Sequence, residues 1–236
     1  MRARFPSSFA LDQSSKREDR LVVFEQLQRC LWCVFDGHRG HQVAAHAAQV
    51  VPKLWREAMD LREVLLRCNE MARAERLPGG STALLVATCE DRIWCCSCGD
   101  SRAVALLRNG HVQRLSAEHT CAVPAEVSRV RRSAPLCCGR LGGLLPMTRG
   151  LGNFDLEAKG FACLPETESV AIHEVQLVIL ASDGLWDVLS DQETCALVAQ
   201  GLTAQELVKE ARRRGSADDI AVIAPRSRFR GSGCRI

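Results

Sequence analysis

Short apolar runs alternate with segments of helical spacing along the chain, and this alternation predicts a mixed fold. Apolar runs bounded by turn residues predict buried strands. They lie at residues 21–24, 31–35, 83–87, 93–98, 103–107, 112–115, 175–182 and 220–224. Apolar residues recur at helical spacing over 43–58 and 61–72, and Pro52 predicts a kink or two shorter helices in the first segment. Capping-box patterns at Ser190 and Thr203 predict helices over 190–198 and 203–213.

The middle of the chain has the pattern of an antiparallel meander. Asn109 and Gly110 stand between two apolar runs and predict a type I′ hairpin. Consecutive strands joined by short turns exclude a simple doubly wound parallel sheet. Residues 7–20 are polar, and residues 116–174 have weak periodicity apart from a short helix expected over 123–131. The segment 142–160 is expected to be an irregular loop that borders a functional site.

Acidic residues adjoin several of the apolar runs. Asp36 and Asp183 each follow a long run, and Asp218 lies just before the last one. Carboxylates so far apart in sequence converge only through folding, and clustered oxygen ligands indicate Mg²⁺ or Mn²⁺. Glu18 and Asp19 precede the first run, and their spacing leaves two interpretations open: a strand flank that faces water, or further metal-binding carboxylates.

Composition narrows the class of protein. The 236 residues fit one large domain or two small ones, with 47% hydrophobic and 25% charged residues. A net charge of +3 is too small to predict nucleic-acid binding. Five of the thirteen cysteines stand in apolar, strand-like stretches: Cys30, Cys33, Cys95, Cys96 and Cys98. The cysteines are therefore interpreted as reduced core thiols, which favours the cytoplasm or nucleus. No run is long enough for a membrane span, and residues 1–10 are too short and polar for a secretory signal.

Seven motifs, taken in order, resemble the protein phosphatase 2C family of metal-dependent serine/threonine protein phosphatases. The resemblance extends over about residues 18–224. Its motifs are Glu18-Asp19-Arg20, VFDGHRG at 34–40, GSTA at 80–83, GDSRAV at 99–104, TRGLG at 148–152, ASDGLWDV at 181–188 and GSADDIAV at 215–222. Any one motif is a weak signal, whereas seven in the family's order are a strong one.

The resemblance implies a fold and a metal centre. The expected fold is α+β, a sandwich of two mainly antiparallel sheets flanked by pairs of helices, in a single phosphatase domain over residues 1–225 with a disordered basic tail over 226–236. Two Mg²⁺ or Mn²⁺ ions are expected, with a weaker third. The implied ligands are Asp36, which bridges both ions, the Gly37 carbonyl, Asp183, Asp218, Glu18 mostly through water, and Asp100 with Asp187 for the third ion.

The implied reaction is hydrolysis of phosphoserine and phosphothreonine in proteins. A hydroxide shared by the two ions attacks phosphorus in line, and no phosphoenzyme is required. The leaving alkoxide needs a proton, and His38 is the candidate general acid. The alternative role for His38 is to orient Asp36.

Some positions depart from the family's pattern. Ser14 stands where the family has an arginine that binds the phosphate, and Arg17 is the candidate replacement. Arg39 replaces a glycine beside His38, where its charge should lower the pKa of His38, and its guanidinium is also a candidate to bind phosphate. Two further departures are Asn153 for the family's Asp and Asp219 for its Asn.

Three functions remain open at this point. The first is an active phosphatase that acts on phosphorylated proteins. It is favoured because three clustered carboxylates repel one another and serve no purpose in a binding module. Such an enzyme is expected to be a monomer without nucleic-acid or membrane partners. A pseudophosphatase that acts as a binding scaffold is favoured by the altered phosphate-binding segment. A metal-dependent nuclease is disfavoured by the small net charge and the 5% aromatic content.

Overall fold

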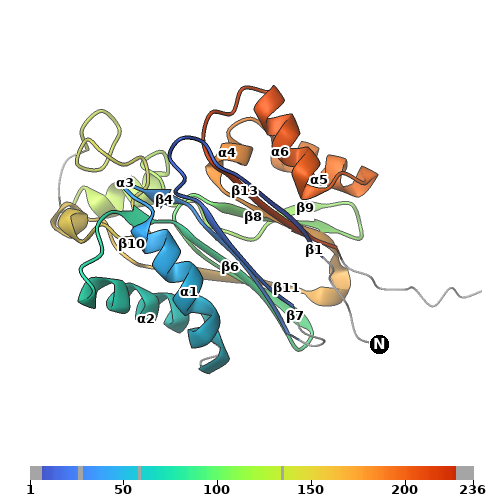
Figure 1. Cartoon of the computed structure of the whole chain (residues 1–236), viewed down its shortest axis with the longest axis horizontal. Helices are drawn as coiled ribbons and strands as arrows, with labels where there is room; N and C mark the ends of the chain where they lie inside the picture. The colour runs from blue at the N-terminus through green and yellow to red at the C-terminus, as the bar shows by residue number, and fades with distance from the viewer. Residues whose placement is uncertain (1–6, 26–28, 58–59, 134–135, 227–236) are drawn as a thin grey trace, which may run out of the picture.

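The architecture is a four-layer sandwich in which two antiparallel sheets lie between two groups of helices (Figure 1). The computed structural model describes residues 7–25, 29–57, 60–133 and 136–226. The expected fold class is confirmed. The tail expected over 226–236 lies outside the described residues, except for Arg226.

Two five-stranded sheets form the centre of the molecule. The first has the strand order β11-β7-β6-β3-β2 and the second β1-β13-β12-β8-β9. The strands of the first are β2 (Arg20–Glu25), β3 (Cys30–Phe35), β6 (Ala83–Cys89), β7 (Arg92–Cys98) and β11 (Glu166–Ala171). The strands of the second are β1 (Ser7–Asp12), β8 (Arg102–Leu107), β9 (Val112–Arg114), β12 (Val175–Ala181) and β13 (Ile220–Pro225).

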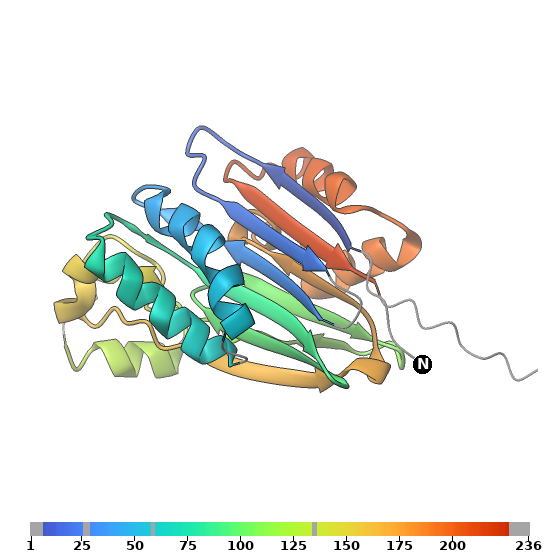
Figure 2. The same ribbon diagram turned by 60° about the horizontal axis from the view of Figure 1, so that its bottom comes forward.

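Helices cover the outer face of each sheet. The pair α1 (Gln42–Glu57) and α2 (Leu61–Ala74) lies across the first sheet (Figure 2), while α4 (Asp183–Trp186), α5 (Asp191–Gln200) and α6 (Ala204–Arg213) cover the second. The short helices α3 (Pro124–Val130), η1 (Phe154–Lys159) and η2 (Ile172–Glu174) lie in the connections. Pro52 lies inside one continuous α1, so the alternative of two shorter helices is wrong.

The alternation of side chains along β3 shows why its run is apolar throughout. Trp32 and Val34 face the core between the sheets, whereas Leu31, Cys33 and Phe35 pack under α1 and α2. Successive residues of a strand point to opposite faces, so a strand covered on both faces needs apolar residues at every position. Full burial of a large apolar side chain stabilises the fold by about 1.5–3 kcal/mol. This burial fixes the strand end from which Asp36 emerges.

The expected antiparallel hairpins in the middle of the chain are present, but their joining into one continuous meander is wrong. Strand β7 pairs with β6 in the first sheet and β8 pairs with β9 in the second, so the chain crosses between sheets at residues 99–101. The β8–β9 turn is also not type I′. Only Gly110 of its central pair has a positive φ, and its N–H donates to the Leu107 carbonyl at 3.0 Å.

Sequence patterns missed two edge strands and a small sheet. Strands β1 and β11 bury only Ala10 and Val170 respectively, so they carry little apolar signal. Strands β4 (Gly37–His38), β5 (Gly80–Ser81) and β10 (Leu151–Gly152) form a three-stranded sheet beside the end of β3. The expected irregular loop over 142–160 therefore contains β10 and η1.

The twelve cysteines among the described residues are all free thiols. Within the same ranges, no helix combines the length and apolar character that crossing a membrane requires.

Candidate active site

The register of both sheets brings the acidic residues to one end of the sandwich. Phe35, the last residue of β3, pairs with Arg20, so Asp36 lies beside Asp19. In the other sheet, Ala181 pairs with both Val222 and Arg102. Asp183 follows the end of β12, Asp218 precedes β13 and Asp100 precedes β8, so all three lie at this same edge. The convergence expected from the sequence is present in the structure.

The carboxyl groups of this cluster disfavour one another's negative charge. Burial, followed by the charges of Asp19 and Asp183, raises the pKa of Asp36 well above its ordinary value. Burial, followed by the charges of Asp218 and Asp187, raises the pKa of Asp183 to about 6. Burial and the charge of Asp183 raise the pKa of Asp100 to about 7. A cation bound here would relieve this repulsion.

Asp19 is the buried member of the N-terminal acidic pair. The Ser182 hydroxyl donates a hydrogen bond of 2.7 Å to its Oδ2, whereas its buried Oδ1 has no hydrogen-bond partner. Burial raises the pKa of Asp19 to about 7. Glu18 is half-buried, and its carboxylate accepts a hydrogen bond of 2.6 Å from the Gly40 N–H. The interpretation of this pair as a strand flank facing water fails for Asp19.

Gly37 lies where no side chain fits. A Cβ built at this position would lie 2.7 Å from the Glu18 carbonyl oxygen. Glycine therefore allows the backbone after Asp36 to approach the segment that carries Glu18.

Asp219 organises the loop before β2, a role that sequence reasoning missed. Its carboxylate accepts hydrogen bonds from the backbone N–H groups of Ser14, Glu18 and Asp19, at 2.5, 2.6 and 3.2 Å. Although burial alone would raise its pKa, these hydrogen bonds lower it. Asp219 accepts from three donors through its two carboxylate oxygens. The amide of an Asn has only one acceptor oxygen and could not form the same set of hydrogen bonds.

Lys16 forms an ion pair with a carboxylate of the cluster. Its Nζ lies 2.7 Å from Oδ2 and 2.9 Å from Oδ1 of Asp218. The hydrogen bond to Asp218, and then the charges of Asp183 and Asp36, raise the pKa of Lys16. Arg17, the candidate from the sequence, is exposed and makes no ion pair with any residue that the structure describes.

His38 lies on β4 in contact with Asn153. The Asn153 side-chain nitrogen donates to His38 Nε2 at 2.5 Å, and the buried Nδ1 has no hydrogen-bond partner. Burial, followed by the charge of Arg39, lowers the pKa of His38 to about 4. The direction agrees with the effect expected of Arg39, but burial is the larger cause.

Arg39 and Asn153, two departures from the family's pattern, contact each other. Arg39 Nη1 donates to Asn153 Oδ1 at 3.2 Å, and its guanidinium also forms a bidentate ion pair with Asp155 at 3.0 and 2.8 Å. Asn153 accepts from Arg39 through its oxygen and donates to His38 through its nitrogen. An amide has both functions, whereas a carboxylate only accepts.

The donor set fits Mg²⁺ or Mn²⁺. Within the described ranges, no three His, Cys, Asp or Glu side chains form a ready-made metal-binding group. However, Oδ1 of Asp19 and Oδ1 of Asp100 are buried without hydrogen-bond partners, and the surrounding carboxyl pKa values are raised. Unpartnered buried oxygens amid repelling carboxylates are the environment that a hard divalent cation stabilises.

Comparisons with known proteins agree with this arrangement. A family model described as protein phosphatase 2C matches residues 13–220. A protein kinase and PP2C-like domain-containing protein of Arabidopsis thaliana is 29% identical over 228 residues, covering 82% of this chain and 34% of that protein. Protein phosphatase 2C homolog 1 of Saccharomyces cerevisiae is 31% identical over 230 residues, covering 81% of this chain and 80% of that protein. The chain thus spans about a third of the first relative's length.

Solved structures share the fold. A C. elegans sex-determining protein superimposes with a TM-score of 0.84 at 25% identity, over 94% of this chain and 64% of that one. Serine-threonine phosphatase 2C from Toxoplasma gondii superimposes with a TM-score of 0.79 at 21% identity, over 94% of this chain and 95% of that one.

Proposed function

Because this chain belongs to the protein phosphatase 2C family, we propose that it hydrolyses phosphoserine and phosphothreonine in proteins. The family is metal-dependent and generally uses Mg²⁺ or Mn²⁺. The observation that carries the proposal is the convergence of Asp36, Asp183 and Asp218 at one end of the sandwich. A phosphothreonine peptide, assayed with metal or with chelator, tests it.

The residues that would hold two ions are the ones that the sequence indicated. Asp36, Asp183 and Asp218 would bind directly, together with the Gly37 carbonyl, while Glu18 would act through water. Asp100 and Asp187 would bind a weaker third ion. When bound, two such ions lower the pKa of a water molecule and neutralise charge on the phosphate oxygens. Asp19, which contacts Ser182, would orient these ligands.

His38 would supply the proton that the leaving alkoxide needs. Its low pKa leaves the imidazole neutral at pH 7 in the protein alone. A phosphate dianion beside the ring favours the imidazolium, because an opposite charge stabilises the protonated form. Substrate binding would therefore prepare the acid. In the neutral ring, Nε2 accepts from the Asn153 side chain, so protonation of this nitrogen would require that hydrogen bond to break.

A cation must also bind the phosphate, and among the described residues Lys16 is the one whose charge pairs with a carboxylate of the cluster. Its ammonium touches Asp218, and the charges of Asp183 and Asp36 also stabilise it. Arg39 is already paired with Asp155, and Arg17 forms no ion pair among the residues that the structure describes. Both arginines remain predictions as phosphate-binding residues.

A scaffold without activity is the second candidate function. The Lys16–Asp218 pair favours it, because an ammonium group that neutralises a metal ligand reduces the need for metal. The expectations of a monomer in the cytoplasm or nucleus, with phosphorylated proteins as partners, also remain proposals. Folded, metal-loaded protein that hydrolyses no phosphopeptide would support the scaffold.

A further inference from the structure

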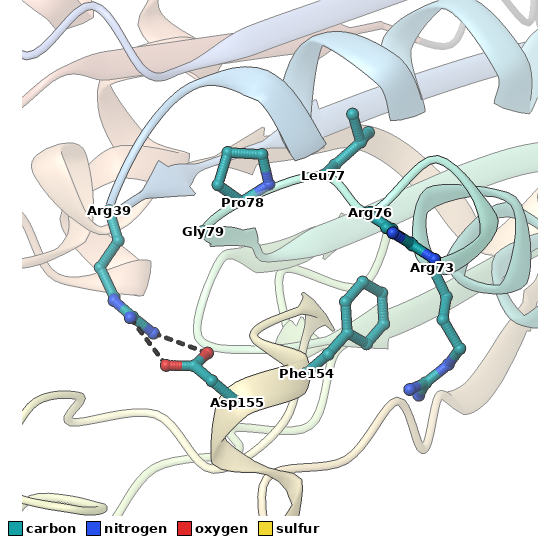
Figure 3. Close-up of a pocket in the computed structure, with 8 residues that line it drawn as sticks. All are labelled: Arg39, Arg73, Arg76, Leu77, Pro78, Gly79, Phe154 and Asp155. Carbon is teal, nitrogen blue, oxygen red and sulfur yellow. Dashed lines mark hydrogen bonds and ion pairs between the residues drawn. The ribbon is translucent and has the colours of Figure 1, made fainter.

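A pocket lined by arginines includes Arg39, the residue after His38 (Figure 3). It has a volume of about 460 Å³ and is formed by three segments: Arg39 after β4, the end of α2 with its loop to β5, and the start of η1. Arg39 directly follows His38 in the chain. A peptide whose phosphorylated residue lies at the carboxylate cluster would therefore pass this pocket within a few residues.

The charges that line the pocket are unequal. Arg39, Arg73 and Arg76 contribute three guanidinium groups, against the single carboxylate of Asp155. Both oxygens of Asp155 are used by Arg39, and Glu157, outside the lining, pairs with Arg73. The side chain of Arg76 has no ion pair among the residues that the structure describes. The pocket therefore presents a net positive charge and unused N–H donors to an entering group.

The apolar lining suits the stem of a side chain. The guanidinium of Arg73 lies 4.2 Å from the centroid of the Phe154 ring, which holds it over the aromatic face. Leu77 and Pro78 line the opposite part of the pocket (Figure 3). Methylene groups would pack on these surfaces while a terminal anion reaches the arginines.

The pocket is also connected to the candidate general acid. Arg39 contacts Asn153, and Asn153 contacts His38. An anion in the pocket would therefore lie two side-chain contacts away from the group that protonates the leaving alkoxide. This proximity links peptide recognition to the site of hydrolysis.

We propose that the pocket of Arg39, Arg73 and Arg76 binds an anionic side chain of the substrate, located within a few residues of the phosphoserine or phosphothreonine. The anion is a carboxylate or a second phosphate, since both match the guanidinium group. A basic side chain is disfavoured, because Asp155 has no oxygen to spare. This proposal rests on the proposed phosphatase function.

The test compares phosphothreonine peptides that differ at one flanking position. Each position from −4 to +4 carries Glu, Gln or phosphoserine, and kcat/KM is measured for the wild type, Arg76→Gln and Arg76→Glu. Arg131→Gln, which alters an exposed arginine outside the pocket, is the matched control. Hydrolysis of p-nitrophenyl phosphate, which has no flanking residues, reports the basal activity.

We expect the wild type to prefer Glu over Gln by about fivefold at one or two positions, in line with a partly exposed ion pair. Arg76→Gln should reduce this preference to less than twofold, and Arg76→Glu should abolish or reverse it, with p-nitrophenyl phosphate hydrolysis unchanged. Phosphoserine that outperforms Glu would identify a second phosphate as the anion. Equal rates for Glu and Gln at all positions, or an unchanged preference in Arg76→Glu, would overturn the proposal.

Fluorescence anisotropy with the same labelled peptides separates this proposal from the proposed function. If no peptide is hydrolysed but the Glu peptide binds more tightly than the Gln peptide, and Arg76→Glu removes the difference, the pocket stands and the phosphatase function fails. If peptides are hydrolysed without any flanking preference, the phosphatase function stands and the pocket proposal fails.

Discussion

The ammonium group of Lys16 bonds to both carboxylate oxygens of Asp218, at 2.7 and 2.9 Å. Asp218 is one of the three carboxylates that would bind metal directly. The same oxygens therefore attract either the ammonium of this chain or a divalent ion. The two side chains are 53% and 39% exposed, so water screens the pair and limits its strength.

Lys16→Met should raise the affinity for Mn²⁺ by about two- to fivefold, because the metal no longer has to displace the ammonium. The same change should lower the melting temperature of the protein in chelator, since the carboxylates lose their counter-ion. Isothermal titration calorimetry and thermal unfolding measure these effects. Lys209→Met, on the exposed face of α6, is the control. Unchanged or weaker Mn²⁺ binding would contradict this interpretation of the pair.

The proposed role of His38 predicts a dependence on the leaving group. His38→Gln should lower kcat for a phosphothreonine peptide by about 10²–10⁴-fold, the usual contribution of a general acid. The loss should be much smaller for p-nitrophenyl phosphate, because its phenolate leaves without a proton. Steady-state kinetics of both substrates provides the comparison. An equal loss for the two would instead indicate that His38 only orients Asp36.

Glu126 on α3 forms a buried ionic network away from the carboxylate cluster. Its carboxylate bonds to Arg149 and Arg129 and accepts from the Thr148 hydroxyl at 2.5 Å. Burial alone would raise its pKa, but the Arg149 and Arg129 bonds lower it from 4.5 to about 2. Because the folded-state pKa is depressed, this stabilisation is fully present above pH 4.5 and disappears as the pH falls through about 2.

Glu126→Gln should reduce the free energy of unfolding at pH 7 by about 2 kcal/mol, since the partly buried guanidinium of Arg129 loses its anion and Arg149 keeps only Glu166. The difference from the wild type should shrink by about 1 kcal/mol at pH 3.5, where part of the stabilisation is already lost. Urea denaturation at both pH values measures it. Glu63→Gln, on the exposed surface of α2, should have little effect at either pH. A pH-independent difference would mean that the carboxylate charge contributes nothing.

The sequence predicts elements that are buried or capped. The apolar runs became β3, β6, β12 and β13, and the Thr203 capping box opens α6 with both of its hydrogen bonds formed. The edge strand β1 was missed because only Ala10 is buried in it, and its backbone hydrogen bonds to β13 leave no trace in the hydrophobic pattern. Periodicity reports burial and does not report strand pairing.

The candidate site, like the fold, could be predicted from the sequence only in part. Asp36 and Asp183 directly follow apolar runs and Asp218 lies shortly before another, so the sequence could indicate them as one set. The contacts that distinguish this chain join residues more than a hundred positions apart, such as Arg39 with Asn153 and Lys16 with Asp218. No local pattern predicts such pairs, because the fold alone determines which loops meet.

The most direct test of the account is hydrolysis of a phosphothreonine peptide by the wild type and by Asp183→Asn, with Mn²⁺, with Mg²⁺ and with chelator. Asp91→Asn, in the β6–β7 turn, is the matched control, and circular dichroism confirms that each variant is folded. We predict that turnover requires metal and falls at least about 100-fold in Asp183→Asn, because metal-ion catalysis contributes several kcal/mol. Folded, metal-loaded wild type without turnover, or turnover that Asp183→Asn leaves unchanged, would contradict the central claim.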